Sequence, residues 1–146
     1  MDDRGSAKYP GLSESAGLYQ DGRKAMASGE FENALKLFQE SLRLYVHFKT
    51  LELMGECCMR LGRFEEALVP LAAASTLNRG ARAPALLAEA FLQMERFHEA
   101  ASTADIAVSR QPHNGRLLAI RDEAHRRAQE ELAEKGIDHP DPHNAD

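Results

Sequence analysis

Tryptophan is absent from this chain of 146 residues, aromatic residues make up only 6% of it, and it holds just two cysteines. The hydrophobic core must therefore be built from leucine, alanine and a few phenylalanines. Cys57 and Cys58 are neighbours in the sequence, and a disulfide between adjacent helical residues would distort the helix. We therefore expect two reduced thiols with a structural role, which suits a reducing compartment.

Long apolar runs are also missing, and basic residues are not in excess. No stretch approaches the roughly 20 apolar residues that a membrane helix needs. The segment from Met1 to Ser6 lacks the apolar core of a signal peptide. The formal net charge of −5 argues against a general binder of nucleic acids or of anionic membranes. We therefore expect a cytoplasmic protein that binds neither nucleic acid nor membrane.

The patterns that are typical of catalytic and metal sites are absent as well. The sequence has no His-Glu-x-x-His pair, no glycine-rich phosphate loop and no nucleophile elbow. His139 and His143 flank a Pro-Asp-Pro segment near the C-terminus, and we interpret them as solvent-exposed rather than metal-binding. We read His125, in the last expected helix, as a residue without a partner. The sequence predicts no enzyme activity, no cofactor and no metal.

The sequence does contain a repeated motif. Phenylalanine and alanine recur together at steps of 33 residues, as Phe31 with Ala34, Phe64 with Ala67, and Phe97 with Ala100. A strict period in the thirties is typical of stacked helical repeats. In such proteins each unit buries its apolar face against the next unit, and the stack leaves an extended concave surface suited to binding.

Apolar spacing and helix-ending residues predict three antiparallel helix pairs and a capping helix. The expected domain covers residues 13–135, with repeats at about 15–47, 48–80 and 81–114 and the capping helix at 115–135. Residues 1–12 and 136–146 are expected to be disordered. Ser13 is the expected cap of the first helix and Asn114 that of the last. Glu95 stands where the other turns have glycine, and a left-handed glutamate there would cost about 1 kcal/mol.

The repeated residues resemble the tetratricopeptide repeat family, a helix–turn–helix unit. The resemblance covers about residues 14–135 and is carried by the phrases above together with three first-helix patterns, Leu18…Gly22…Ala25, Leu51…Gly55…Cys58 and Leu87-Ala88…Phe91. It implies an all-α fold, a right-handed superhelical α-solenoid of three antiparallel helix pairs plus a capping helix. Gly22, Gly55 and Ala88 are small where two helices should cross closely, and the three repeated phenylalanines should wedge into each pair.

In proteins with this resemblance, one face of the first helices lines a concave groove that binds a partner. On this sequence the face is made of Tyr19, Arg23, Met26, Lys49, Glu52, Glu56, Met59, Arg60, Arg82, Glu89 and Gln93. Some family members clamp the terminal carboxylate of an Hsp70- or Hsp90-type tail with lysine, arginine and asparagine. Glu52 and Glu56 would repel a carboxylate in the middle of this groove and no asparagine is expected on it, so we predict no such clamp.

The resemblance implies a non-catalytic protein–protein interaction module, a scaffold or adaptor that binds a peptide or a helix of a partner. Two alternatives stay open at this point. One is a small dedicated chaperone for a client protein, similar to those of type III secretion. The other is a non-catalytic subunit of an enzyme complex. A homo-oligomer also stays open, because a short stack of repeats leaves its end faces exposed.

Overall fold

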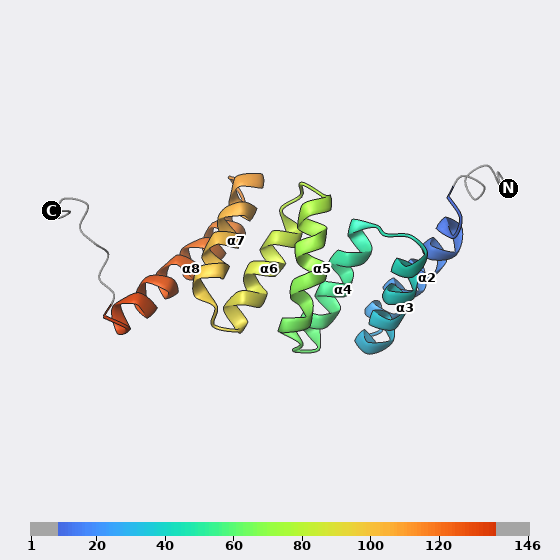
Figure 1. Ribbon diagram of the computed structural model, residues 1–146, viewed down its shortest axis with the longest axis horizontal. Helices are drawn as coiled ribbons and strands as arrows, with labels where there is room; N and C mark the ends of the chain where they lie inside the picture. The colour runs from blue at the N-terminus through green and yellow to red at the C-terminus, as the bar shows by residue number, and fades with distance from the viewer. Residues whose placement is uncertain (1–8, 137–146) are drawn as a thin grey trace.

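The computed structural model describes residues 9–136, and within that range the chain is all-helical. The helices are α2 (Leu12–Ala27), α3 (Phe31–Leu44), α4 (Phe48–Arg60), α5 (Phe64–Leu77), α6 (Arg82–Gln93), α7 (Phe97–Arg110) and α8 (Gly115–Glu134). Each helix packs against the next one along the chain, and the helices stand in one row with α2 and α8 at opposite ends (Figure 1). The expected all-α solenoid is therefore confirmed. Of the segments 1–12 and 136–146 that are expected to be disordered, residues 1–8 and 137–146 lie outside the described part of the chain.

The two expected caps have different outcomes. Asn114 caps α8, because its Oδ1 accepts hydrogen bonds from the backbone N–H groups of Arg116 at 3.0 Å and Leu117 at 3.2 Å. The prediction for Ser13 was wrong, because α2 begins one residue earlier, at Leu12. The N-cap is Gly11, which has a left-handed backbone with φ of 83° and makes no side-chain cap bond.

The turn inside each helix pair has the same geometry in all three units. Gly29, Gly62 and Glu95 have left-handed φ values of 76°, 72° and 57°. The residue after each turn donates its backbone N–H to a carbonyl five residues earlier, as in the 2.8 Å bond from Arg63 to Cys58. These bonds satisfy carbonyl groups at the end of the first helix. The turn predicted at Glu95 is thus formed without glycine.

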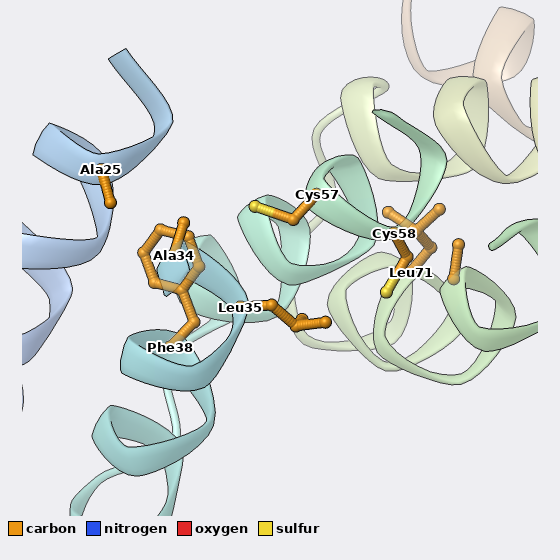
Figure 2. Packing of buried hydrophobic residues seen from close by; sticks show 8 residues of the cluster. Ala25, Ala34, Leu35, Phe38, Cys57, Cys58 and Leu71 are labelled. Atoms are coloured by element: carbon orange, nitrogen blue, oxygen red, sulfur yellow. The ribbon is translucent and has the colours of Figure 1, made fainter. Parts of the chain in front are cut away.

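Small residues on the first helix of each pair give room to a large residue from the second. A Cβ atom built on Gly22 would lie 2.5 Å from the Phe38 ring, and one on Gly55 would lie 2.4 Å from Leu71. Ala88, the equivalent of these glycines in the third unit, is fully buried. Figure 2 shows Phe38 reaching from α3 towards α2 and Leu71 lying near Cys58. The expected close crossings are therefore present.

The repeated phenylalanines are only half-buried, so their expected role as interface wedges is weaker than predicted. The fully buried ring is that of Phe38, inside α3. Two of the repeated rings contact a guanidinium group from the following unit. Arg60 lies 5.3 Å from the centroid of Phe31, and Arg127 lies 4.6 Å from that of Phe97.

An arginine from the third unit holds the junction between the second and third units. The Arg110 Nη1 lies 3.0 Å from the carbonyl oxygen of Ser75, 3.2 Å from that of Asn78 and 3.1 Å from that of Gly80. These carbonyls belong to the end of α5 and the connection to α6. Arg110 therefore supplies donors to backbone groups that the end of a helix leaves unsatisfied.

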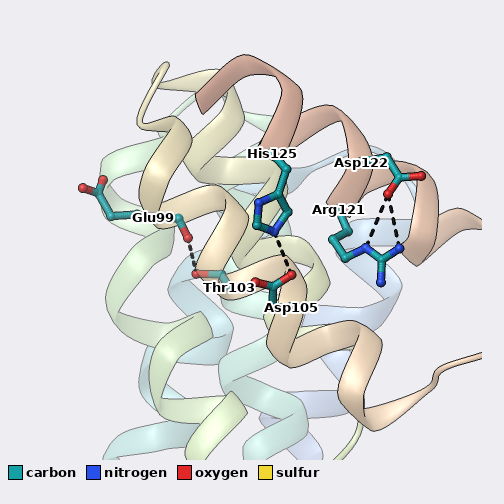
Figure 3. Close-up of polar contacts among 6 residues, drawn as sticks. All are labelled: Glu99, Thr103, Asp105, Arg121, Asp122 and His125. Carbon is teal, nitrogen blue, oxygen red and sulfur yellow. Dashed lines mark hydrogen bonds and ion pairs between the residues drawn. The ribbon is translucent and has the colours of Figure 1, made fainter. Parts of the chain in front are cut away.

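The last helix, α8, buries Leu117, Ala124 and Ala128 and keeps a charged outer side, as expected of a capping helix. His125 does have a partner, which corrects the sequence-based reading. Its Nε2 lies 2.9 Å from the Asp105 carboxylate on α7, so the pair joins α8 to α7 (Figure 3). Beyond α7, the C-terminal part of α8 extends past the row of helices (Figure 1).

The left-handed backbone at Glu95 leads to a stability prediction. Glu95→Gly should raise stability by about 1 kcal/mol, because glycine has no Cβ atom to clash in this region. Thermal unfolding followed by circular dichroism should show a midpoint higher by about 3 °C. Gly62→Glu is the matched control, since φ there is also positive and the surrounding space is open. It should lower the midpoint by a similar amount, and an unchanged midpoint in both variants would contradict the proposed strain.

The close crossing at Gly55 leads to a second prediction. Gly55→Ala should destabilise the fold by about 1–3 kcal/mol, because its Cβ would overlap the Leu71 side chain. Gly17→Ala is the matched control inside another helix, where nothing lies within 4 Å of the added carbon. Alanine should there stabilise the helix by about 1 kcal/mol. Urea unfolding curves measure both, and equal effects of the two substitutions would be inconsistent with a tight crossing at Gly55.

Candidate functional site

A hollow that we call the central groove crosses the first helices of the repeats. It is lined by Tyr19 and Arg23 of α2, by Phe48, Lys49, Glu52 and Leu53 of α4, by Arg82 of α6, and by Asn78, Gly80, Ala81 and Gln111 from the connections between units. Arg23 and Lys49 are exposed, and neither pairs with a carboxylate among residues 9–136. The side chain of Arg23 lies 6.0 Å from the Tyr19 ring centroid.

Two further hollows adjoin the central groove and share lining residues with it. The N-terminal pocket is lined by Leu12, Ser15, Ala16, Tyr19, Ser41, Tyr45, His47, Lys49 and Thr50. The C-terminal pocket is lined by Glu56, Ala81, Arg82, Ala85, Leu86, Glu89, Gln111, Asn114, Arg116 and Leu117. The N-terminal pocket shares Tyr19 and Lys49 with the central groove, and the C-terminal pocket shares Arg82 with it. The three hollows thus follow one another along the first helices and α8.

The wall of the N-terminal pocket is fixed by two buried serines that join α2 to α3. Ser15 Oγ donates to the Ser41 carbonyl at 2.9 Å, and Ser41 Oγ donates to the Ser15 carbonyl at 2.8 Å. Both hydroxyl groups are therefore satisfied inside the protein. The remaining lining is mainly apolar and aromatic, and it includes no carboxylate.

The residues predicted for the groove are brought together only in part. Those that line the central groove or the C-terminal pocket are Tyr19, Arg23, Lys49, Glu52, Glu56, Arg82 and Glu89. Met26 and Met59 instead pack against the buried core, and Arg60 lies over the Phe31 ring. Gln93 lines a separate hollow with Glu123 and Arg127 of α8.

Sequence reasoning missed the lining residues that come from connections between units. Asn78, Gly80 and Gln111 belong to these connections, and the apolar period of a helix gives no signal for such positions. The segment Asn78-Arg79-Gly80 lies where one expected repeat ends, but its sequence does not show which way it faces. Asn78 and Asn114 also correct the expectation that no asparagine borders the groove.

The acidic residues in the middle of the groove are already paired. Arg82 Nη1 donates to Glu52 at 3.0 Å, and its Nη2 donates to Glu56 at 2.6 Å. Burial alone would lower the pKa of Arg82, but hydrogen bonds to Glu56 and Glu52 raise it above its ordinary value, so the guanidinium stays charged. Glu52 is only 8% exposed, which makes this pairing necessary. The two glutamates therefore repel an incoming carboxylate less than the sequence predicts.

The central groove and the C-terminal pocket differ in the charge of the side chains that line them. The central groove has three basic side chains, those of Arg23, Lys49 and Arg82, against the single carboxylate of Glu52, which gives it a net charge of +2. The C-terminal pocket has two basic and two acidic side chains, and its Arg116 donates to Glu89 at 2.8 Å. Arg82 lines both hollows and enters both counts, so the excess positive charge lies towards α2, at Arg23 and Lys49, in a chain whose net charge is −5.

No arrangement for chemistry is apparent in the described part of the chain. The thiols of Cys57 and Cys58 are free and buried. Burial, and to a lesser degree Cys58 and Glu56, raises the pKa of Cys57 to about 12, so the thiol is protonated at neutral pH. Across residues 9–136, no three His, Cys, Asp or Glu side chains are grouped to hold a metal ion. His139 and His143 lie outside that range. Among the helices of that range, none has the length and apolar character to cross a membrane.

The comparisons with known proteins identify the fold. No protein-family model and no curated protein matches the sequence. The Sgt2 TPR domain from Aspergillus fumigatus superposes with a TM-score of 0.73 and 20% identity over 88% of this chain and 86% of that one. The first TPR of Spaghetti (RPAP3), bound to the HSP90 peptide SRMEEVD, superposes with a TM-score of 0.74 and 16% identity over 79% of this chain and 93% of that one. Pseudomonas aeruginosa PcrH, in complex with the chaperone binding region of PopB, superposes with a TM-score of 0.66 and 23% identity over 79% of this chain and 94% of that one.

The raised pKa of Cys57 predicts its reactivity. In the native protein at pH 8, both thiols should resist alkylation by iodoacetamide, because Cys57 and Cys58 are buried and burial raises the pKa of each. Mass spectrometry after a short exposure should find unmodified protein, while the same exposure in urea should label both cysteines. Rapid labelling of the native protein would show that the thiols are accessible and would contradict the buried arrangement.

Proposed function

Because the chain has the tetratricopeptide-repeat fold, we propose that it is a non-catalytic protein-interaction module that binds a peptide or a helix of a partner protein in the central groove. The observation that carries this proposal is the run of three adjoining hollows along α2, α4, α6 and α8. A surface of this shape and extent suits an extended or helical segment better than a small molecule.

The chemistry of the lining supports a peptide as the ligand. Tyr19 and Phe48 offer aromatic surface, Arg23 and Lys49 offer exposed charge, and Asn78 and Gln111 offer side-chain amides. Aromatic and arginine side chains contribute most to binding at protein interfaces. The fold neighbours are consistent with this reading, since one is bound to an HSP90 peptide and another to the chaperone binding region of PopB.

A dedicated chaperone is the second candidate, and the likeness to PcrH favours it. The two functions differ in what they do to a partner. A chaperone should co-purify with one client and keep it soluble when the two are expressed together. A scaffold should bind short segments of its partner reversibly and leave the solubility of that partner unchanged.

A pair of alanine substitutions tests the use of the groove. Arg23→Ala combined with Lys49→Ala should weaken capture of the partner by about fivefold or more, because both charges line the groove and neither pairs with a carboxylate among residues 9–136. Pull-downs from a lysate of the source organism, quantified by mass spectrometry against the wild type, measure the loss.

The matched control is Lys36→Ala combined with Arg43→Ala, which removes the same charge from exposed positions on α3 outside the three hollows. Circular dichroism should show both double variants folded. If the groove variant retains full capture while the α3 variant loses it, the partner binds to another face and the proposal is wrong.

A further inference from the structure

The repeat symmetry makes three junctions between neighbouring first helices comparable. Arg23, Glu56 and Glu89 occupy equivalent positions at steps of 33 residues, and Lys49, Arg82 and Arg116 form a second equivalent set at steps of 33 and 34. At two of the junctions a member of the second set contacts a member of the first set from the preceding unit, and at the first junction the two residues line the same hollow.

Two of the junctions are closed by an ion pair of the same kind. Between α4 and α6, Arg82 donates to Glu56 at 2.6 Å, and between α6 and α8, Arg116 donates to Glu89 at 2.8 Å. In both, an arginine at the start of one helix reaches back to a glutamate near the end of the helix in the preceding unit. The carboxylate is part of the chain, so these junctions need no anion from outside.

The first junction, between α2 and α4, lacks this internal carboxylate. Arg23 takes the place of the glutamate and Lys49 that of the arginine, so two cations line the same hollow. Neither has a carboxylate partner within the described chain. Two like charges that share a hollow repel each other and attract an anion.

The N-terminal pocket adjoins this cation pair. Lys49 and Tyr19 line both hollows, and the pocket continues through Leu12, Ala16 and Tyr45 without a carboxylate. An apolar side chain can therefore be accommodated beside a carboxylate that binds Arg23 and Lys49. At the other end, Arg82 pairs with both Glu52 and Glu56 and offsets one of their two negative charges, so this part of the groove repels such a ligand less than two free glutamates would.

We infer that the junction of α2 and α4 binds a carboxylate side chain from an internal segment of the partner, next to an aliphatic or aromatic residue that enters the N-terminal pocket. The partner thus supplies the anion that Glu56 and Glu89 supply at the other junctions. This inference rests on the proposed function. It adds that the bound partner residue is acidic, that its neighbour in the partner is aliphatic or aromatic, and that both bind at the α2–α4 side of the groove.

Selection of peptides from a random library tests the inference. Segments of about twelve residues, displayed inside a carrier so that no terminal carboxylate is free, are selected on the wild-type protein, and the enriched sequences are made as labelled peptides with blocked ends. We expect aspartate or glutamate next to leucine, isoleucine or an aromatic residue. Replacing the acid by its amide should weaken binding by about tenfold.

The decisive variant is Arg23→Glu, which gives Lys49 an internal carboxylate like those of the other junctions. This substitution should lower the affinity for the selected acidic peptide by about tenfold or more, because it places a carboxylate where the peptide carboxylate binds. It should also raise the melting temperature of the protein, because it replaces the repulsion between two cations by an attraction. Lys36→Glu on α3 makes the same charge change outside the groove and should alter affinity by less than about twofold.

The outcomes separate the inference from the proposed function. Selected peptides that shift the backbone NMR signals of the groove but carry no acid, or that bind Arg23→Glu as tightly as wild type, overturn the inference and leave the groove function intact. A selection that enriches no peptide, or peptides that shift only signals outside the groove, overturns both. A lower melting temperature for Arg23→Glu would contradict the repulsion on which the inference depends.

Discussion

The architecture depends on a very small residue, glycine or alanine, at the point where the two helices of a unit cross. Phe38 fits over Gly22 and Leu71 fits over Gly55, at distances that leave no space for even one more carbon atom. In the third unit Ala88 is the buried equivalent. This contact brings the hairpin together, and interiors as dense as this tolerate little change of volume. It also orients the first helix, whose buried side faces its partner and whose opposite side is left to line the groove.

Features that depend on a few neighbouring residues could be read from the sequence. The turns at Gly29, Gly62 and Glu95 follow from a signal that recurs every 33 residues, and the start of α8 follows from the cap residue Asn114. The start of α2 could not be read in this way, because the left-handed backbone of Gly11 competes with the capping tendency of Ser13. The sequence alone does not reveal which of two neighbouring cap candidates the fold uses.

The groove could be predicted only where a helix supplies it. Tyr19, Arg23 and Lys49 follow from the helical period, whereas Asn78 and Gln111 come from connections whose direction depends on the packing of two units. The charge of Glu52 was misread for the same reason. Its partner, Arg82, lies 30 residues further along the chain, and only the stacking of α6 on α4 brings the two together. The electrostatic effect of a surface residue thus depends on contacts that the local pattern does not contain.

The hydrogen bonds of Arg110 to the α5–α6 connection make the two junctions between repeats unequal. One step earlier the equivalent residue is Leu77, which cannot donate to a carbonyl, so the connection between α3 and α4 has no such clasp. Loss of α7 therefore leaves the end of α5 with bare carbonyl groups, and opening of the third pair spreads into the second. The first pair is joined to the second by other contacts, such as that of Arg60 with the Phe31 ring, and not by donors to a helix end. We therefore expect unfolding of the third pair to expose backbone carbonyl groups of the second, an effect that unfolding of the first pair does not have through an equivalent residue.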